Sequence, residues 1–411
     1  MSYPLRQIAQ FASVRSGYAF KSADWQSNGV AVVKIGNIKE GSIVLDGCSY
    51  VSEETADSAH EYRLHFGDVL ITMSGIIGEV GRVRTHQPLL LNQRVGRFVL
   101  HRPGELSLDY LFYCLRAPST RTNIEAVAYG AAQPNVRPTL IGQTEVAVPP
   151  RRVQDRIANI LAAYDDLIEN STKRITLLEQ QTALMFGHVE ADARSAAKRR
   201  DLGEIADEAG GTIRTGPFGS QLHESDYTTE GTPVVMPKNL REGRIDTSDI
   251  ARIPEDIVER LAHHELSEGD IVYGRRGDIG RRAFIRQRQA GWLCGTGCLR
   301  ITLPGGPLRS RYLHQYLGKP EIVSLIASRA VGATMPNLNT SILRGIPIDV
   351  PPLRLQDEFV RIADANDELV NVLAAKNENL RKQRDLLLPR LLSGEIDVSR
   401  LPTPEGAAGE R

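Results

Sequence analysis

The chain contains an internal duplication at a spacing of 202 residues, and this feature constrains its fold more than any other. Four segments recur in the same order: FGDVL at 66–70 returns as EGDIV at 268–272, Tyr-Leu at 110–111 returns at 312–313, GAAQPN at 130–135 returns as GATMPN at 332–337, and Pro-Pro at 149–150 returns at 351–352. One such match would be chance, but four ordered matches at one spacing indicate duplication. A repeat of about 200 residues is too long for a solenoid unit. The 411 residues therefore hold two copies of one domain, which agrees with the number of domains expected for this length.

Each copy shows the same order of expected elements. Short β-like runs, broken by Gly and Asn, come first, as at 30–35, 68–73 and 95–100. After them come a helical stretch at 108–128 and 309–330, a loop marked by Gly and Pro at 130–135 and 332–337, and a short strand at 145–148 and 346–350. This order predicts an α+β fold made of two tandem copies of a mixed α/β domain.

A long helix is expected to close each copy, because residues 153–186 and 355–388 contain neither Gly nor Pro. Each helix would run about 50 Å, which is longer than its own domain needs. Both helices carry a heptad seam, although the second seam is thinner and more polar. Its members include Leu161, Ile168, Ile175 and Leu178 in the first helix and Val370, Leu373, Leu380 and Leu387 in the second. Two arrangements stay open: each helix packs on its own domain, or the two helices pack on each other as a rigid spacer.

The duplication and the change of composition after each Pro-Pro divide the chain into six parts. They are a first domain at 1–152, a first spacer helix at 153–190, a connector at 191–200, a second domain at 201–352, a second spacer helix at 353–392 and a C-terminal tail at 393–411. We expect the end of the tail, residues 402–411, to be disordered.

Several kinds of chemistry lack their motif in this sequence. It has no phosphate-binding G-x-x-x-x-G-K-[ST] and no G-x-G-x-x-G. A zinc site at Cys294 and Cys298 would need a second pair of ligands, and none lies nearby in the sequence. We predict that Cys298 is a core residue. Neither Pro-Pro has the flanking residues of an adenine methyltransferase motif, and no lysine follows an acidic residue at the spacing of the common nuclease core. We therefore predict a binding protein without catalytic residues, metal or cofactor.

Positive charge gathers in the same region of both copies, although the 50 basic and 50 acidic residues balance. Residues 80–104 hold five arginines and no acid, and residues 275–300 hold seven arginines and one acid. Such separation of charge suggests a surface for a polyanion, and arginine suits phosphate and guanine because its planar fork binds them with two hydrogen bonds. A GC-rich genome would also raise the arginine content, but it would not explain the clustering.

Polar residues that could read base edges lie in or near these windows, since Asn and Gln suit adenine and Arg suits guanine. The candidates for DNA contact are Lys34, Asn37, Lys39, Ser74, Asn92, Gln93, Arg94 and Arg97 in the first copy, and Lys238, Asn239, Arg241, Arg275, Arg276, Arg281 and Thr296 in the second. Asn92-Gln93-Arg94 corresponds roughly to Gly295-Thr296-Gly297, so the frame matches while the side chains differ. A common backbone frame with different side chains is what we expect of two domains that read different DNA sequences. The alternative for any single residue is an ordinary solvated loop position.

The chain resembles the specificity (S) subunits of type I restriction–modification systems over nearly its whole length. The resemblance rests on the duplicated domain, the 66–70 and 268–272 runs before Gly-rich turns, the 130–135 and 332–337 elements, and a long helix after each copy. The run QRDLLLPRLLSGEI at 383–396 is typical of the C-terminus of that family.

The resemblance implies that each copy is a target-recognition domain that reads one half of a split site in double-stranded DNA. The two helices would form an antiparallel coiled-coil spacer. Two modification subunits, which carry S-adenosylmethionine and methylate adenine, and two restriction subunits, which use ATP and Mg²⁺, would join the chain, and none of these cofactors would bind the chain itself. Two alternatives stay open: a specificity subunit of a system that only methylates, and a tandem-domain scaffold that does not read DNA.

The sequence predicts a cytoplasmic protein. No apolar run approaches the roughly 20 residues of a membrane helix, and the first 30 residues show no secretory signal. Four cysteines in 411 residues are too few for a disulfide framework and suit a reducing compartment.

Overall fold

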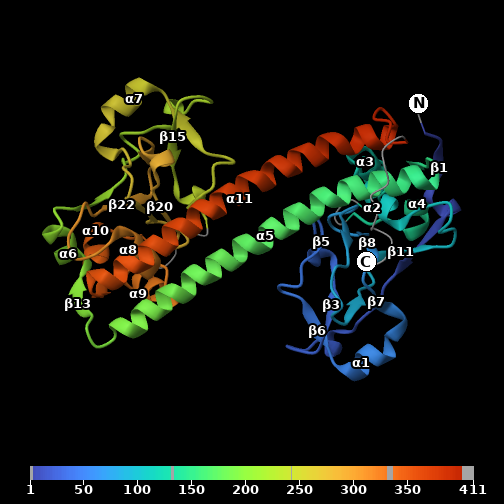
Figure 1. The fold of residues 1–411 in the computed structure, drawn as a ribbon, viewed down its shortest axis with the longest axis horizontal. Coiled ribbons are helices and arrows are strands. Elements are labelled where there is room, and N and C mark those ends of the chain that lie inside the picture. The colour runs from blue at the N-terminus through green and yellow to red at the C-terminus, as the bar shows by residue number, and fades with distance from the viewer. Residues whose placement is uncertain (1–2, 131–133, 242, 331–336, 400–411) are drawn as a thin grey trace. The chain divides into compact units, whose positions relative to one another are not determined.

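The computed structural model describes residues 3–130, 134–241, 243–330 and 337–399 (Figure 1). The chain divides into two compact units. Unit 1 comprises Met1–Thr172 and Ala375–Arg411, and unit 2 comprises Lys173–Ala374. The predicted disordered tail end at 402–411 lies outside the described residues, as do parts of both Gly-Pro loops.

Unit 1 contains two main sheets and a small one. The six-stranded sheet has the order β2-β11-β8-β9-β5-β4, the four-stranded sheet has the order β6-β3-β10-β7, and β1 pairs with β12. The strands are β1 Leu5–Gln7, β2 Ala12–Ser16, β3 Val30–Val33, β4 Ile38–Lys39, β5 Gly41–Ile43, β6 Ser49–Val51, β7 Arg63–Leu64, β8 Val69–Thr72, β9 Val80–Arg82, β10 Leu89–Leu91, β11 Val95–Leu100 and β12 Glu145–Ala147.

The short helices of unit 1 are α1 Glu53–Ser58, α2 Leu108–Arg116, α3 Pro118–Ala126 and α4 Pro138–Gln143. Three of them, α2 to α4, share a core with the six-stranded sheet, and α1 packs on the four-stranded sheet. The helical stretch expected at 108–128 is two helices, because Ala117 is extended and Pro118 starts a new helix at its first turn. Ile71 of β8, Phe98 of β11 and Tyr110 of α2 belong to one buried core.

Unit 2 repeats this plan. Its sheets have the orders β14-β22-β19-β20, β18-β15-β21, β16-β17 and β13-β23. The strands are β13 Lys198–Asp201, β14 Thr212–Thr215, β15 Thr232–Val235, β16 Leu240–Arg241, β17 Arg244–Ile245, β18 Ala251–Ile253, β19 Ile271–Gly274, β20 Arg282–Phe284, β21 Leu293–Cys294, β22 Cys298–Thr302 and β23 Pro347–Val350. The helices are α6 Leu202–Glu208, α7 Glu255–Arg260, α8 Ser310–Tyr316, α9 Pro320–Arg329 and α10 Thr340–Arg344.

The pairing of the strands bears out the duplication. In unit 1, β11 lies between β2 and β8, and β3 runs parallel to β10. In unit 2, β22 lies between β14 and β19, and β15 runs parallel to β21. The residues at 191–200, which the sequence suggests are a connector, contain the end of α5 and most of β13.

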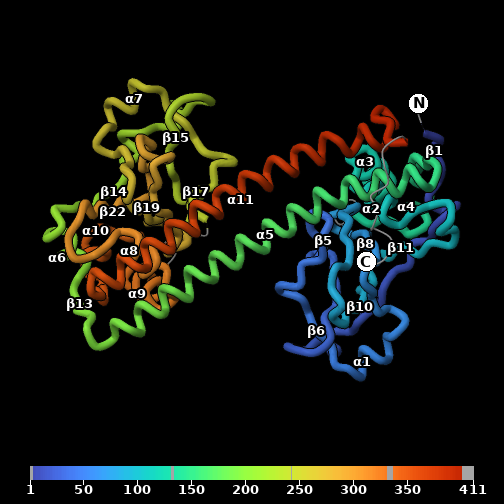
Figure 2. Tube along the Cα trace, in the orientation of Figure 1, coloured from blue at the N-terminus to red at the C-terminus, as the bar shows by residue number. Residues whose placement is uncertain are grey.

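Two long helices follow the two domains, α5 Arg151–Ala193 and α11 Leu353–Ser393. Each unit holds the beginning of one helix and the end of the other, and within each unit they run antiparallel (Figure 2). In unit 1, Asn377 of α11 contacts Thr172 of α5. Arg384, further along α11, contacts Asp165, which lies earlier on α5. The antiparallel helix pair expected from the resemblance is therefore present.

The seam positions face inward along both helices. Leu161, Ile168, Val370 and Leu373 are buried, and Ile175, Leu178, Leu380 and Leu387 are half-buried. Both helices also pack on the domains: Ile157 of α5 and Leu388 of α11 lie in the core of unit 1, and Phe186 of α5 contacts Tyr312 within unit 2 with ring centroids 5.0 Å apart. The helices therefore pack both on each other and on the domains.

Candidate nucleic-acid interface

Three backbone segments meet in unit 1, and we call this arrangement the three-loop junction. Its segments are the turn after β8 at 73–78, the loop between β10 and β11 at 92–94, and the segment before α4 at 134–136. The main-chain nitrogen of Met73 donates to the carbonyl of Arg94 at 3.0 Å, and that of Val136 donates to the carbonyl of Met73 at 2.9 Å. Gly75 and Gly78 turn the first segment with φ values of 71° and 78°, which few residues besides Gly adopt easily.

Unit 2 builds the same junction from the matching segments at 275–280, 295–297 and 337–338. The nitrogen of Arg275 donates to the carbonyl of Gly297 at 2.9 Å, and that of Leu338 donates to the carbonyl of Arg275 at 2.8 Å. An antiparallel bridge joins Arg276 to Asn337, as another joins Ser74 to Asn135 in unit 1.

The loop between the strands matches position by position. Val95 donates its main-chain N–H to Asn92 at 3.0 Å, and Cys298 donates to Gly295 at 3.2 Å. The predicted correspondence of Asn92-Gln93-Arg94 with Gly295-Thr296-Gly297 is confirmed.

The side chains on this common frame differ between the units. In unit 1, Gln93 and Arg94 are exposed, and Ile76 at the tip of the turn is 69% exposed. In unit 2, Arg276 is exposed. Ser74 and Thr296, one in each unit, have buried hydroxyl oxygens without a hydrogen-bond partner in the described structure.

Most arginines of the first basic window are held by carboxylates of unit 1. Of the five at 80–104, four form ion pairs: Arg82 with Asp109 at 3.0 Å, Arg84 with Asp166 at 2.9 Å, Arg97 with Asp68 at 3.4 Å and Arg102 with Glu105 at 3.5 Å. Arg94 is the one without a carboxylate partner among the described residues.

Most arginines of the second basic window, residues 275–300, also have partners within unit 2. Arg281, Arg286 and Arg300 pair with Asp278, Asp364 and Asp270, while Arg275, Arg282 and Arg288 donate hydrogen bonds to neutral groups. Arg276 has neither kind of partner in the part of unit 2 that is described. The windows are therefore not the free basic surfaces that their composition suggests, and Arg94 and Arg276 are the exposed members whose side chains have no partner among the described residues.

A known family covers both units. The family model described as the type I restriction modification DNA specificity domain matches residues 2–180 and again residues 199–382. The chain belongs to this family.

Relatives and a solved structure of the same class match most of the chain. The MjaIX specificity subunit of Methanocaldococcus jannaschii is 22% identical over 354 residues, with 82% of this chain and 79% of that protein covered. The EcoKI specificity subunit of Escherichia coli K12 is 23% identical, with 92% and 85% covered. The type I S subunit of M. genitalium has the same fold, with a TM-score of 0.65, 17% identity and coverage of 95% and 96%. The chain is thus a DNA sequence-specificity subunit of the type I restriction–modification class, a recognition component and not a catalyst.

Several candidate residues of this specificity subunit are occupied by local contacts. Asn37 is buried, accepts from the nitrogen of Lys34 at 2.9 Å and donates to the carbonyl of Val44 at 3.0 Å. Asn239 makes the matching pair of bonds in unit 2, with Met236 and Asp246. Both asparagines shape a turn, so we leave them out of the proposed contact surface.

The cations near these turns differ in how free they are. Lys34 lies 3.7 Å above the Trp25 ring and donates to Ser49, and burial lowers its pKa. Lys39 is exposed. Lys238 and Arg241 pair with Asp249 and Asp246 on the surface, which leaves them available because exposed pairs are weak.

Sequence reasoning missed the residues that anchor each domain to its helix. Gln154 is fully buried at the start of α5, accepts from the nitrogen of Ser107 at 2.8 Å and donates to two carbonyls. Gln356 repeats these contacts at the start of α11, where it accepts from Arg309. A glutamine kept at the 202-residue spacing on an apolar helix face was the available signal.

A second anchor is an aspartate one helical turn above the seam residue Leu161. Asp165 accepts from Arg116 and Tyr113 at 2.9 Å and from Arg384 at 2.7 Å. Asp367, at the matching position in unit 2, accepts from Arg311 at 2.7 Å and pairs with Arg286.

The described residues contain no cluster of three or more His, Cys, Asp or Glu side chains placed to hold a metal ion. Cys298 is buried, as predicted for a core residue; Cys294 is buried as well, and burial raises its pKa to about 12. No helix in the described structure is long and apolar enough to span a membrane.

Proposed function

We propose that each unit reads one half of a bipartite site in double-stranded DNA through the exposed residues of its three-loop junction. The observation that carries this proposal is one hydrogen-bonded frame that presents different side chains in the two units. Gln93 and Arg94 in unit 1 occupy the places of Thr296 and Gly297 in unit 2, and the exposed Arg276 of unit 2 occupies the place of the buried Ser74. A fixed frame with exchanged polar groups can hold the duplex in one way while reading different bases.

We propose further that the antiparallel helices set the number of unread base pairs between the half-sites. Each helix of about 40 residues is stiff over a length of about 60 Å, and Asp165 and Asp367 tie the domains to it. A fixed gap between half-sites fits such a spacer better than a flexible connector would.

The partners we propose are two modification subunits, which carry S-adenosylmethionine and methylate adenine, and two restriction subunits, which use ATP and Mg²⁺. Support comes from exposed leucines that repeat at the 202-residue spacing on the long helices. Leu184 and Leu386 are 68% and 70% exposed, and Leu167 and Leu369 are 46% and 37% exposed. Apolar positions repeated in both copies suit two copies of one partner. The cytoplasm, where DNA and these cofactors meet, is the proposed location.

Exchange of one domain tests this function. Residues 201–352 are replaced by the matching domain of another specificity subunit, and a second variant exchanges residues 1–152 instead. Each is expressed with its modification subunit, and methylated adenines are mapped across the genome. Each exchange should change a different half of the methylated site and leave the other half intact. A change in both halves, or in neither, would contradict independent reading.

A further inference from the structure

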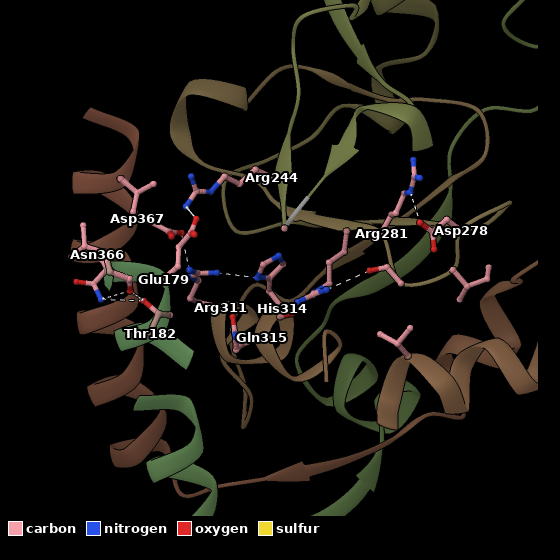
Figure 3. Close-up of a pocket in the computed structure, with 17 residues that line it drawn as sticks. Glu179, Thr182, Arg244, Asp278, Arg281, Arg311, His314, Gln315, Asn366 and Asp367 are labelled. Carbon is pink, nitrogen blue, oxygen red and sulfur yellow. Dashed lines mark hydrogen bonds and ion pairs between the residues drawn. The ribbon is translucent and has the colours of Figure 1, made fainter. Parts of the chain in front are cut away.

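Unit 2 contains a cavity of about 560 Å³ beside the long helices (Figure 3). It is bounded by Gly243 and Arg244, the turn at 278–282, α8 and the parts of α5 and α11 that belong to this unit. Four arginines and a histidine line it: Arg244, Arg281, Arg282, Arg311 and His314. A cavity of this size can hold a ligand as large as a mononucleotide.

The cavity exists because unit 2 has smaller side chains where unit 1 has large ones. Residues matched by the duplication are Tyr113 and Gln315, Arg116 and Gly318, Arg121 and Val323, Tyr164 and Asn366, and Arg384 and Thr182. In unit 1 the guanidinium of Arg116 lies against Gly41, with its Cζ 2.9 Å from the place of a Cβ there. In unit 2 the matching Gly243 faces the ring of His314 instead, at 3.4 Å.

Three of the four arginines already have carboxylate partners. Arg244 pairs with Glu179 at 2.9 Å, Arg281 with Asp278 at 2.9 Å, and Arg311 with Asp367 at 2.7 Å. Figure 3 shows the first two pairs on opposite sides of the cavity.

Arg282 is the exception. It donates to the main-chain carbonyls of His314 at 2.7 Å and Gly280 at 3.4 Å, and no carboxylate of the described residues lies within 4.0 Å. Burial lowers its pKa, which reflects the cost of holding a cation out of water without a counter-ion. The matching position in unit 1 is Val80, so this cation is peculiar to the unit that has the cavity.

His314 adds a ring N–H group that has no good hydrogen-bond acceptor. Arg311 donates to its Nδ1 at 2.9 Å, so the proton of the neutral ring belongs on Nε2. This buried Nε2 makes no well-formed hydrogen bond among the described residues, and the main chain of Gly243 is the polar group beside it. His314 is 4% exposed and lines the cavity.

We propose that this cavity binds a phosphate group, with Arg282 as its counter-ion and the Nε2–H of His314 as a hydrogen-bond donor. An oxyanion would neutralise the unpaired guanidinium and accept the orphan proton together, and guanidinium forks suit phosphate oxygens. The phosphate belongs either to a free ligand or to the DNA backbone.

Titration of the full chain without DNA tests the site. Inorganic phosphate is added against chloride at equal ionic strength, and the melting temperature and the heat of binding are followed. Phosphate should raise the melting temperature in a saturable way. Arg282→Val, which restores the residue of unit 1, should weaken phosphate binding by about tenfold or more. Arg260→Ala, which changes an exposed arginine outside the cavity and outside the three-loop junction, should bind phosphate like the wild type.

The same variants separate the two sources. If the occupant is a DNA phosphate, Arg282→Val should also reduce the dependence of DNA affinity on salt, and free phosphate should compete with DNA; if it is a free ligand, DNA binding should stay unchanged. Arg282→Lys keeps the charge without the fork and should lie between the wild type and Arg282→Val. Equal phosphate binding by the wild type and Arg282→Val, or no response of the wild type to phosphate together with unaltered DNA binding by Arg282→Val, would overturn the proposal. None of these results depends on whether the three-loop junctions read DNA.

Discussion

Asn366 of α11 donates its side-chain amide to the hydroxyl oxygen of Thr182 on α5 at 3.1 Å. Asn377 makes the same contact with Thr172, also at 3.1 Å, in the other unit. Both asparagines are buried at seam positions, where an apolar residue would add stability. A buried polar residue that finds its partner in only one alignment fixes the register of a helix pair at some cost in stability.

The first prediction concerns this register. Replacing Asn366 and Asn377 together by Leu should leave the chain folded, with a change in unfolding free energy of at most about 2 kcal/mol. The helices can then slide, so the methylated sites should show several gap lengths in place of one. Asn379→Leu, the same change on the exposed face of α11, is the control. A single gap retained in the double variant would assign the register to other contacts.

The second prediction concerns the Asp165 anchor and pH. Burial alone would raise the pKa of Asp165, but Arg116 and Arg384 together hold it below its ordinary value. A carboxyl with a depressed pKa stabilises the fold above its unfolded value of about 3.9, and this contribution disappears as the pH falls through the folded value. Asp165→Asn should therefore destabilise the chain by about 2–4 kcal/mol at pH 7.

The difference between Asp165→Asn and the wild type should shrink as the pH drops below about 4, because the wild type then loses the same charge. Urea unfolding at a series of pH values measures it. Asp155→Asn, which breaks a pair that is 43% exposed on both sides, should have little effect at any pH. A constant difference between pH 7 and pH 3 would mean that the ion pairs do not hold the domain on its helix.

The third prediction separates arginines that are free from arginines that are used inside the fold. Arg94→Ala and Arg276→Ala should each reduce the slope of log affinity for DNA against log salt by about 0.9, the value for one phosphate contact. Arg97 comes from the same basic window but pairs with Asp68 and donates to the carbonyl of Arg63. Arg97→Ala should keep the slope of the wild type. If Arg94→Ala and Arg276→Ala also keep the slope of the wild type, the three-loop junctions do not contact the DNA backbone.

The fourth prediction concerns the length of the spacer. Seven residues inserted after Arg174 in α5 and seven at the facing point after Ala374 in α11 keep the heptad seam and both Asn–Thr contacts, and they add about 10 Å to the pair. At 3.4 Å per base pair, the gap between half-sites should grow by about three base pairs. After an insertion into α5 alone, Thr172 and Thr182 cannot both stay beside Asn377 and Asn366, so methylation should be lost. Methylation mapping reads both results, and an unchanged gap after the matched insertion would refute the spacer.

The duplication made the fold predictable from the sequence. Two copies at one spacing implied two equal domains, and long runs without Gly or Pro implied the helices, because both are local or periodic signals. The break at Pro118 was also visible, since proline favours the first turn of a helix. The match of Asn92 to Gly295 lies one residue off this spacing, so the sequence predicted it only roughly.

The candidate site was less predictable, because charge composition does not reveal where a side chain finds its partner. Arg84 lies in a window without acids, yet it reaches Asp166, 82 residues later on α5. Arg286 reaches Asp364, 78 residues away. The arginine windows therefore combined domain anchors with the few exposed arginines, and only the folded chain separates them. Asn37 is a similar case, since its amide donates to the carbonyl of Val44, seven positions later, and closes a turn.

Methylation mapping of the unmodified chain, expressed with its modification subunit, shows whether two domains on a fixed helix pair choose the site. We expect one methylated motif with two constant half-sites separated by a gap of one fixed length. A continuous motif, or two half-sites with a gap that varies from site to site, would contradict it.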